Sequence, residues 1–590
     1  MTNRPKSRLA VGDGHLAAGS VQHRMTASRI FPMPHILLGL IFGLFVLLSG
    51  VGPSHAQSQP IRPVGVVVHV DLEEAIQQCK SQYKKMHNGK EPSKSDVQSC
   101  LSDLFVSLLS PSYISGIALG VHWDRIQLQS MEAFCQQYTC PSGHSCPSDI
   151  KCLSGAIIPI AVVVANSDFF DWSYILSAFG VANGAGKNVL LKLTPGVQSP
   201  KWLTNPSTGQ IASCDTPVFE GGKADPGCGT QTFHKIPEQI RADTEIQPLP
   251  WNVTYQSAWA NFLYQLKHAI ADQFPLIFVG IDLAGPNCAS DEMILPTSAY
   301  GSYVKSNSPK GKTDADDAWT MLIANTYQKK DPTLLNSDQV FINSWYTFIV
   351  TYEEIFQNLT LVISPDDETS MPEIGPPTVH GDNFLYSTDD LCSKTASKFA
   401  VSCETKTEVL SNFLDYPTTN QPNATKGGNL KAALIGGLIT ASNPDNGEIG
   451  LPAVKLMAQK YGIWGGAQFD HPVSNPEFTQ EEGCPLGQVC KCPKSDPNCS
   501  FVTVTVGQAM LGVLGNFFDG TQYGGIQWPW GGTMGQQRLQ YLMVEYEDIE
   551  YALDPRNQYA TDFQNYLCAA SIALYKMAGQ TPRTCIQSGP

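Results

Sequence analysis

The chain has 590 residues, of which 42% are hydrophobic and 15% charged, and its formal net charge at pH 7 is −15. This length exceeds one minimal domain but suits a barrel with long loop insertions. The acidic balance argues against nucleic acid or an anionic membrane as a partner, and it suits a neutral substrate.

An apolar stretch near the N-terminus, His35–Leu48, is preceded by arginines and followed by Ser54-His-Ala56. This pattern is typical of a secretory signal peptide. We expect cleavage after Ala56, so that residues 1–56 are the signal peptide and residues 57–590 form the folded domain. An uncleaved membrane anchor is the alternative, which the short apolar core disfavours. We therefore expect a secreted or periplasmic protein without membrane contact after cleavage.

The 17 cysteines of an exported protein are expected to form disulfides. Proximity in the sequence predicts Cys79–Cys100, Cys214–Cys228, Cys392–Cys403 and Cys568–Cys585, with further pairs inside the clusters 135–152 and 484–499. These pairs leave Cys288 over, which we expect to be a small buried side chain, with a thiol nucleophile as the alternative. Export and irregular spacing argue against zinc at the two clusters, and neither a metal nor a cofactor is expected.

Eight short apolar segments bounded by Gly, Pro or Asp are typical of strands that are buried on both faces. In chain order they are Arg62–Val70, Tyr113–Val121, Asn188–Thr194, Leu276–Ala284, Leu359–Ser364, Ala432–Ile439, Gly462–Phe469 and Leu539–Glu545. Helical patterns lie between or after them at Thr254–Ala271, Asp317–Tyr327, Pro452–Lys460, Val504–Phe518 and Asp562–Met577.

This alternation predicts an α/β fold with parallel strands. We expect a (β/α)8 TIM barrel with long disulfide-bonded loop insertions, at residues 134–156, 204–246, 364–428 and 472–500. A doubly wound open sheet is the main alternative, but the chain has no Gly-rich phosphate loop that opens a helix.

The fourth predicted strand runs into a turn-rich segment that carries Asn287 and Glu292. In a (β/α)8 barrel, residues just past the carboxyl ends of the strands build the active site. A carboxyl group beside a polar amide is suited to protonating the leaving oxygen of a glycosidic bond. The segment therefore predicts Glu292 as a general acid and Asn287 as a substrate contact. A solvated loop carboxylate is the structural alternative for Glu292.

Aromatic residues near the predicted strand ends fit a sugar site. Trp123 and Trp202 follow the second and third strands, and Trp528 and Trp530 precede the last strand. Flat rings stack on the C–H faces of sugars while hydroxyls bond to nearby amides and carboxylates. Packing in the core is the alternative for each of the four rings.

The order of several motifs resembles the retaining glycoside hydrolases of clan A, the β-galactosidase and cellulase-like barrels. The motifs are Gly116 with Trp123-Asp-Arg-Ile126, Phe170-Asp-Trp-Ser173, Gly186–Leu193 and Gly196–Leu203, followed by a helix and a strand between Trp251 and Glu292. The resemblance implies a barrel that hydrolyses O-glycosidic bonds of an oligo- or polysaccharide with a pair of Glu residues. It gives Glu292 the acid/base position, although the clan usually has Asn and Glu adjacent.

The nucleophile of that clan is a Glu at the end of the seventh strand. The seventh predicted strand here ends in Gln468-Phe-Asp470, where the Gln468 amide would bind a sugar hydroxyl and Asp470 could attack. The last predicted strand aims Glu545 at the mouth, which makes Glu545 the preferred nucleophile; a structural hydrogen-bond partner is the alternative. His69, Asp71 and His122 are expected to line the floor of the pocket, with a structural hydrogen-bonded role as the alternative for each. A catalytically silent barrel that binds glycans is the alternative function.

Overall fold

The computed structural model describes residues 63–130, 133, 150–151, 157–158, 169–215, 228–234, 244–288, 295–296, 302–303, 313–327, 339–363, 433–436, 464–468, 488–490, 501–503, 539–557, 560–582 and 584–585.

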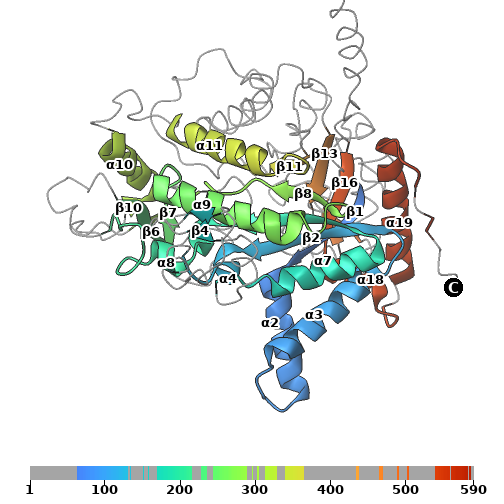
Figure 1. Cartoon of the computed structure of the whole chain (residues 1–590). Helices are drawn as coiled ribbons and strands as arrows, with labels where there is room; N and C mark the ends of the chain where they lie inside the picture. The colour runs from blue at the N-terminus through green and yellow to red at the C-terminus, as the bar shows by residue number, and fades with distance from the viewer. Residues whose placement is uncertain are drawn as a thin grey trace, which may run out of the picture. The chain divides into compact units, whose positions relative to one another are not determined.

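Eight parallel strands form the centre of this structure (Figure 1). They are β1 (Gly65–Asp71), β2 (Ile114–His122), β5 (Asn188–Thr194), β8 (Phe278–Asp282), β11 (Thr360–Ile363), β12 (Ala433–Gly436), β13 (Trp464–Gln468) and β16 (Leu539–Glu545). The order of pairing is β1-β16-β13-β12-β11-β8-β5-β2, and β2 pairs again with β1. The sheet therefore curls until its pairing closes on itself, and each strand has two neighbours.

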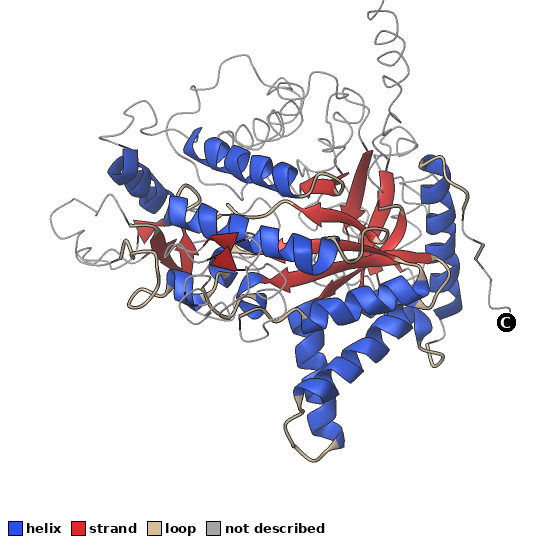
Figure 2. Cartoon of the chain, viewed as in Figure 1, coloured by secondary structure: helices blue, strands red, loops and turns tan. Residues whose placement is uncertain are grey.

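The prediction of an α/β fold with parallel strands is confirmed, and all eight predicted segments contain one of these strands. A doubly wound open sheet would leave two edge strands with a single neighbour each, which this pairing does not have. Helices follow five of the eight strands within the described ranges, and Figure 2 shows them around the strands. The predicted helices Pro452–Lys460 and Val504–Phe518 lie outside the described residues.

The described helices, in chain order, are α2 (Leu72–Met86), α3 (Lys94–Leu109), α4 (Trp123–Ile126), α7 (Ser173–Ala185), α8 (Lys201–Thr204), α9 (Val253–Leu266), α10 (Ala315–Tyr327), α11 (Gln339–Ile355), α18 (Tyr546–Leu553) and α19 (Ala560–Met577), with a 3-10 turn at Gly196–Gln198 and a π-helical turn at Lys267–Ala271. Local chemistry fixes where α2 and α3 begin. Asp71 accepts a hydrogen bond from the backbone N–H of Glu74, and Ser93 and Asp96 form a capping box at the start of α3. The two helices form a hairpin that extends away from the strands (Figure 1).

Alternate residues of the strands face two different surroundings. One set, which includes Val66, Val68 and Leu119, joins a large apolar core with residues of the surrounding helices. The other set forms a separate apolar cluster inside the barrel, made of Val67, Ala118, Leu190, Val362, Tyr541 and Met543. This alternation is the period of two expected of a strand that is buried on both faces.

A glycine in β13 makes room for the largest side chain of the inner cluster. Gly466 is paired in register with Tyr541, and a Cβ at position 466 would lie 2.1 Å from the Tyr541 ring. The Gly-rich sequence of this strand therefore reflects the space that the Tyr541 ring needs.

The insertions carry short strands of their own. A four-stranded sheet contains β6 (Thr230–His234), β7 (Thr244–Pro248), β9 (Ser302–Tyr303) and β10 (Thr313–Asp314), and two two-stranded sheets contain β3 (Ile150–Lys151) with β4 (Ile157–Ile158) and β14 (Gln488–Cys490) with β15 (Phe501–Thr503). Three predicted disulfides are confirmed: Cys79–Cys100 links α2 to α3, Cys214–Cys228 lies in an insertion, and Cys568–Cys585 ties α19 to the C-terminal segment. The predicted pair Cys392–Cys403 lies outside the described residues.

Among the helices that the structure describes, none combines the length and the apolar character needed to cross a bilayer.

Candidate functional site

A layer of polar side chains lies at the carboxyl ends of the strands, above the inner apolar cluster. Its members occupy inward positions, because each is two or four residues further along its strand than a member of that cluster. They are His69 and Asp71 on β1, His122 on β2, Lys192 on β5 and Glu545 on β16. This is the end of a parallel barrel where active sites are found.

Glu545 is held by His69, its partner in the register between β16 and β1. Nδ1 of His69 lies 2.9 Å from Oε2 and 3.1 Å from Oε1 of the carboxylate. Because an ionised carboxylate can only accept hydrogen bonds, Nδ1 carries the proton in this contact, and Nε2 of a neutral ring is then an acceptor. A methyl group at Gly120 would lie 3.6 Å from that Nε2, so the glycine leaves this edge of the ring uncovered. Glu545 thus lies at the mouth, fixed in orientation.

A second polar contact crosses the interior. Nζ of Lys192 on β5 donates a 2.8 Å hydrogen bond to Oε1 of Gln468 on β13, and these two strands lie opposite each other in the ring. Both side chains are buried. The register between β5 and β8 pairs Leu191 with Ile281, so the next inward positions, Lys192 and Asp282, are neighbours. A buried cation beside a buried carboxylate forms the floor of the mouth.

His122 and Asp71 make a looser contact at the same rim, with 3.7 Å between Nε2 of His122 and Oδ2 of Asp71. The other carboxylate oxygen of Asp71 caps α2. The side chain of His122 is 15% exposed, so His122 is reachable from solvent.

Two residues predicted to contact the sugar, Trp123 and Asn287, are buried within the protein, whereas Trp202 is only partly buried. Trp123 has no exposed surface and contacts Trp259 of α9 with ring centroids 4.9 Å apart, so its ring faces the helix layer. Trp202 packs edge-on against Trp123 and is only partly buried. Asn287 is fully buried, and its Oδ1 accepts a 2.7 Å hydrogen bond from the backbone N–H of Gly285. The amide therefore closes a turn after β8, because Gly285 has a φ of 145° that brings its N–H toward it.

Four further predicted site residues lie outside the described residues, and their positions relative to Glu545 are therefore left as predictions: Glu292, Asp470, Trp528 and Trp530.

Glu547 lies in the first turn of α18, two residues after Glu545. Burial raises the pKa of the Glu547 carboxyl to about 7, and the charge of Glu545 adds to the rise. An acid with a pKa in this range is able to hold and release a proton at neutral pH.

Cys288 is unpaired and buried, as the sequence predicted for a small core side chain. Burial raises the pKa of its thiol far above the usual range, so the reactive thiolate is disfavoured. In the part of the chain that the structure describes, no group of three or more His, Cys, Asp and Glu side chains is arranged to hold a metal ion.

No protein-family model and no curated protein matches this sequence. Among solved structures, the chain is similar to the catalytic domain of the β-amylase from Paenibacillus polymyxa, with a TM-score of 0.35 and 10% sequence identity over 80% of this chain and 94% of that chain. A likeness at this score carries no argument about chemistry.

Sequence reasoning missed Lys192 and Asp282. The signal was present, since each is a charged residue inside an otherwise apolar strand. A charge at such a position has to face the barrel interior or a partner, because the opposite face packs on helices.

Proposed function

We propose that this chain is a secreted glycoside hydrolase with a complete (β/α)8 barrel, in which Glu545 is the nucleophile and Glu292 the acid/base. The observation that supports it best is the position of Glu545: a carboxylate at the end of a central strand, 13% exposed and oriented by His69. Retaining glycosidases need one ionised carboxylate aimed at the anomeric carbon and one protonated carboxyl group beside it.

In the proposed first step, an oxygen of Glu545 attacks the anomeric carbon while the glycosidic C–O bond breaks and Glu292 gives its proton to the leaving oxygen. In the second step Glu292 takes a proton from water, whose oxygen attacks the same carbon and releases Glu545. His69 Nδ1 lies within hydrogen-bond distance of both carboxylate oxygens, so the attacking oxygen would leave this contact while the other keeps it.

The test is hydrolysis of a panel of aryl glycosides by the purified protein and by the variant Glu545→Gln. If Glu545 is the nucleophile, the variant keeps sugar binding and loses about a thousandfold or more in kcat. Glu91→Gln is the control, since it removes an exposed carboxylate that is not part of the mouth. Equal losses in both variants, or full activity in Glu545→Gln, would contradict the assignment.

A glycan-binding barrel without turnover is the second candidate function. The observation in its favour is that both oxygens of Glu545 lie within 3.1 Å of His69 Nδ1. Saturable sugar binding by the native protein with no hydrolysis across the panel would support this candidate.

Export is the remaining part of the proposal. It is supported by the signal-like N-terminal segment and by the three disulfides, which persist in oxidising compartments. N-terminal sequencing of the protein recovered outside the producing cell is expected to begin at Gln57, and a product that retains residues 1–56 would contradict it.

A further inference from the structure

A cavity of about 200 Å³ lies beside the mouth, outside the barrel wall. Residues of α2, the end of β2, α4 and the start of α7 line it. An apolar cavity of roughly 150 Å³ is able to hold benzene, so this one has room for a six-membered ring with one substituent.

The inner wall of the cavity is aliphatic. Ile76, Val121, Ile126 and Ile175 form this wall, and the least buried of them is 7% exposed; polar side chains, among them Gln77, His122 and Tyr174, line the rest of the cavity. Such a wall offers no partner to the hydroxyl groups of a sugar, whose burial there would cost free energy. The occupant that fits it has an apolar body.

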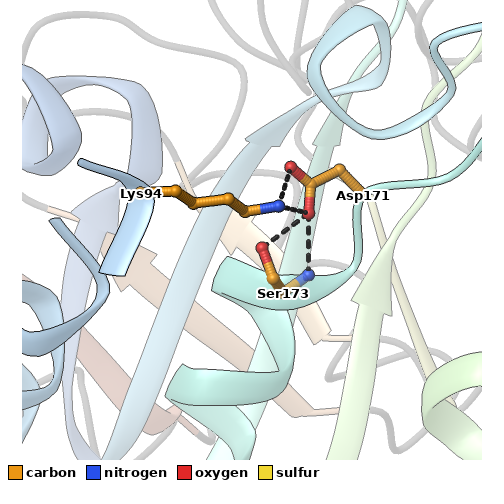
Figure 3. A network of polar contacts seen from close by, with 3 residues as sticks. All are labelled: Lys94, Asp171 and Ser173. Carbon is orange, nitrogen blue, oxygen red and sulfur yellow. Dashed lines mark hydrogen bonds and ion pairs between the residues drawn. The ribbon is translucent and has the colours of Figure 1, made fainter. Parts of the chain in front are cut away.

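The acidic groups at the rim already have partners within the protein. Glu73 accepts a 2.8 Å hydrogen bond from Gln77 and lies 3.4 Å from Nε of Arg125. Asp171 accepts from Nζ of Lys94 with both oxygens, each at 2.8 Å, and from the backbone N–H and hydroxyl of Ser173 (Figure 3). Neither carboxylate therefore calls for a cationic ligand.

The basic groups at the rim have capacity left. Lys80 makes no ion pair or hydrogen bond with any other residue in the described part of the chain. Arg125 is 58% exposed, and its ion pairs with Glu73 and Asp124, at 3.4 and 3.8 Å, both use Nε, which leaves the terminal N–H groups of the guanidinium. Both line the same cavity.

We propose that this cavity binds a small amphipathic monoanion, an aryl or short-chain carboxylate. Its ring or chain lies on the aliphatic wall, and its carboxylate bonds to Lys80 and Arg125. A pocket with an apolar wall and a few convergent polar groups is the usual form of a small-molecule site. Glu545 does not line the cavity, although His122 lines it as well as the mouth, and the proposal does not depend on the proposed function.

The test uses benzoate as the probe and benzyl alcohol as its neutral counterpart, each titrated into the purified protein by calorimetry and by NMR of the isoleucine methyl groups. Benzoate is expected to bind saturably with one site and to shift the methyl signals of Ile126 and Ile175. Lys80→Met and Arg125→Gln are each expected to raise the Kd by about tenfold, because each removes a charge-assisted hydrogen bond. Lys85→Met, an exposed lysine of the same helix outside the cavity, is the matched control and is expected to leave the Kd unchanged.

Three results would overturn the proposal. One is the absence of saturable benzoate binding to the native protein, and another is equal affinity for benzyl alcohol, which would remove any role for the charge. The third is unchanged benzoate affinity in both Lys80→Met and Arg125→Gln. Since neither replaced side chain is part of the buried core, these variants are expected to fold, and a circular dichroism spectrum matching the native protein checks this.

Discussion

Replacing Asp171 separates two roles of one carboxylate at the start of α7. It accepts two hydrogen bonds from Lys94, one of 3.2 Å from the backbone N–H of Ser173 and one of 2.5 Å from the Ser173 hydroxyl. The bond to the helix N–H is worth about 1 kcal/mol and the hydroxyl bond about as much. The ion pair adds about 0.5 kcal/mol, because the Lys94 side chain is 48% exposed and solvent screens it.

Asp171→Ala is therefore expected to lower the free energy of unfolding by about 2–3 kcal/mol, whereas Asp171→Asn loses only the ion pair and costs about 0.5–1 kcal/mol. Urea unfolding near neutral pH measures both. The surface variant Glu91→Gln, which also loses one lysine contact, is the control and is expected to stay within about 0.5 kcal/mol of the native protein.

The pH dependence of this difference has a definite sign. Burial opposes ionisation of Asp171, but the hydrogen bonds from Lys94 and Ser173 outweigh it and lower the pKa of the carboxyl. A lowered pKa stabilises the fold above the pKa of the unfolded chain, and this stabilisation is lost as the pH falls through the folded value. The gap between the native protein and Asp171→Asn is expected to close in acid. Equal unfolding free energies for the Ala and Asn variants, or a gap that persists at low pH, would refute this assignment.

Three further outcomes test other parts of the structure. Reducing or replacing the Cys79–Cys100 disulfide is expected to lower the free energy of unfolding by about 3 kcal/mol, because the disulfide closes a loop with a sequence separation of 21. Urea unfolding measures this, and an unfolding midpoint that stays at the native value would contradict it. Gly196→Ala is expected to lower the free energy of unfolding by about 3 kcal/mol or more, since φ at this position is +58° and the new Cβ would lie 1.8 Å from the carbonyl oxygen of Cys288. An unchanged melting temperature would contradict this close approach of the two segments. Glu547→Gln is expected to be more stable than the native protein above about pH 7, because the raised pKa of the Glu547 carboxyl makes the native protein lose stability as the pH rises from the unfolded-state pKa to about 7. Thermal melts of both proteins across this pH range test it, and a difference in melting temperature that does not change with pH would exclude it.

The strands were predictable because each is a short apolar run bounded by turn residues. Asn188–Thr194 and Leu539–Glu545 match the predicted limits residue for residue. Signals were weaker in β13, where glycines replace apolar side chains, and the reason is a tertiary contact: the ring of Tyr541 fills the space beside Gly466. The hairpin of α2 and α3 was not predicted, although the capping residues Ser93 and Asp96 mark the start of its second helix.

The site was predictable only in part, since a sequence gives the end of a strand but not what packs there. Glu545 and Gln468 lie at the mouth as their positions on the last and seventh predicted strands indicate. Trp123 also follows a strand, yet it packs against the rings of Trp259 and Phe262 of α9. The residues next to Trp123 in the sequence do not indicate this long-range contact. Lys192 could have been predicted from the cost of burying a charge, because a lysine inside an apolar strand requires a polar partner in the interior.

The two contacts that build the mouth join segments made at very different times. His69 and Glu545 are separated by 476 positions along the chain, and Lys192 and Gln468 by 276. At about 5–20 residues per second, roughly 25–95 s of translation pass between the synthesis of His69 and that of Glu545. The nascent chain therefore carries His69 without its partner for most of its synthesis, and Lys192 for a shorter part of it. The mouth is complete only when the last strand has been synthesised, so a product truncated before Glu545 lacks the contact between His69 and Glu545.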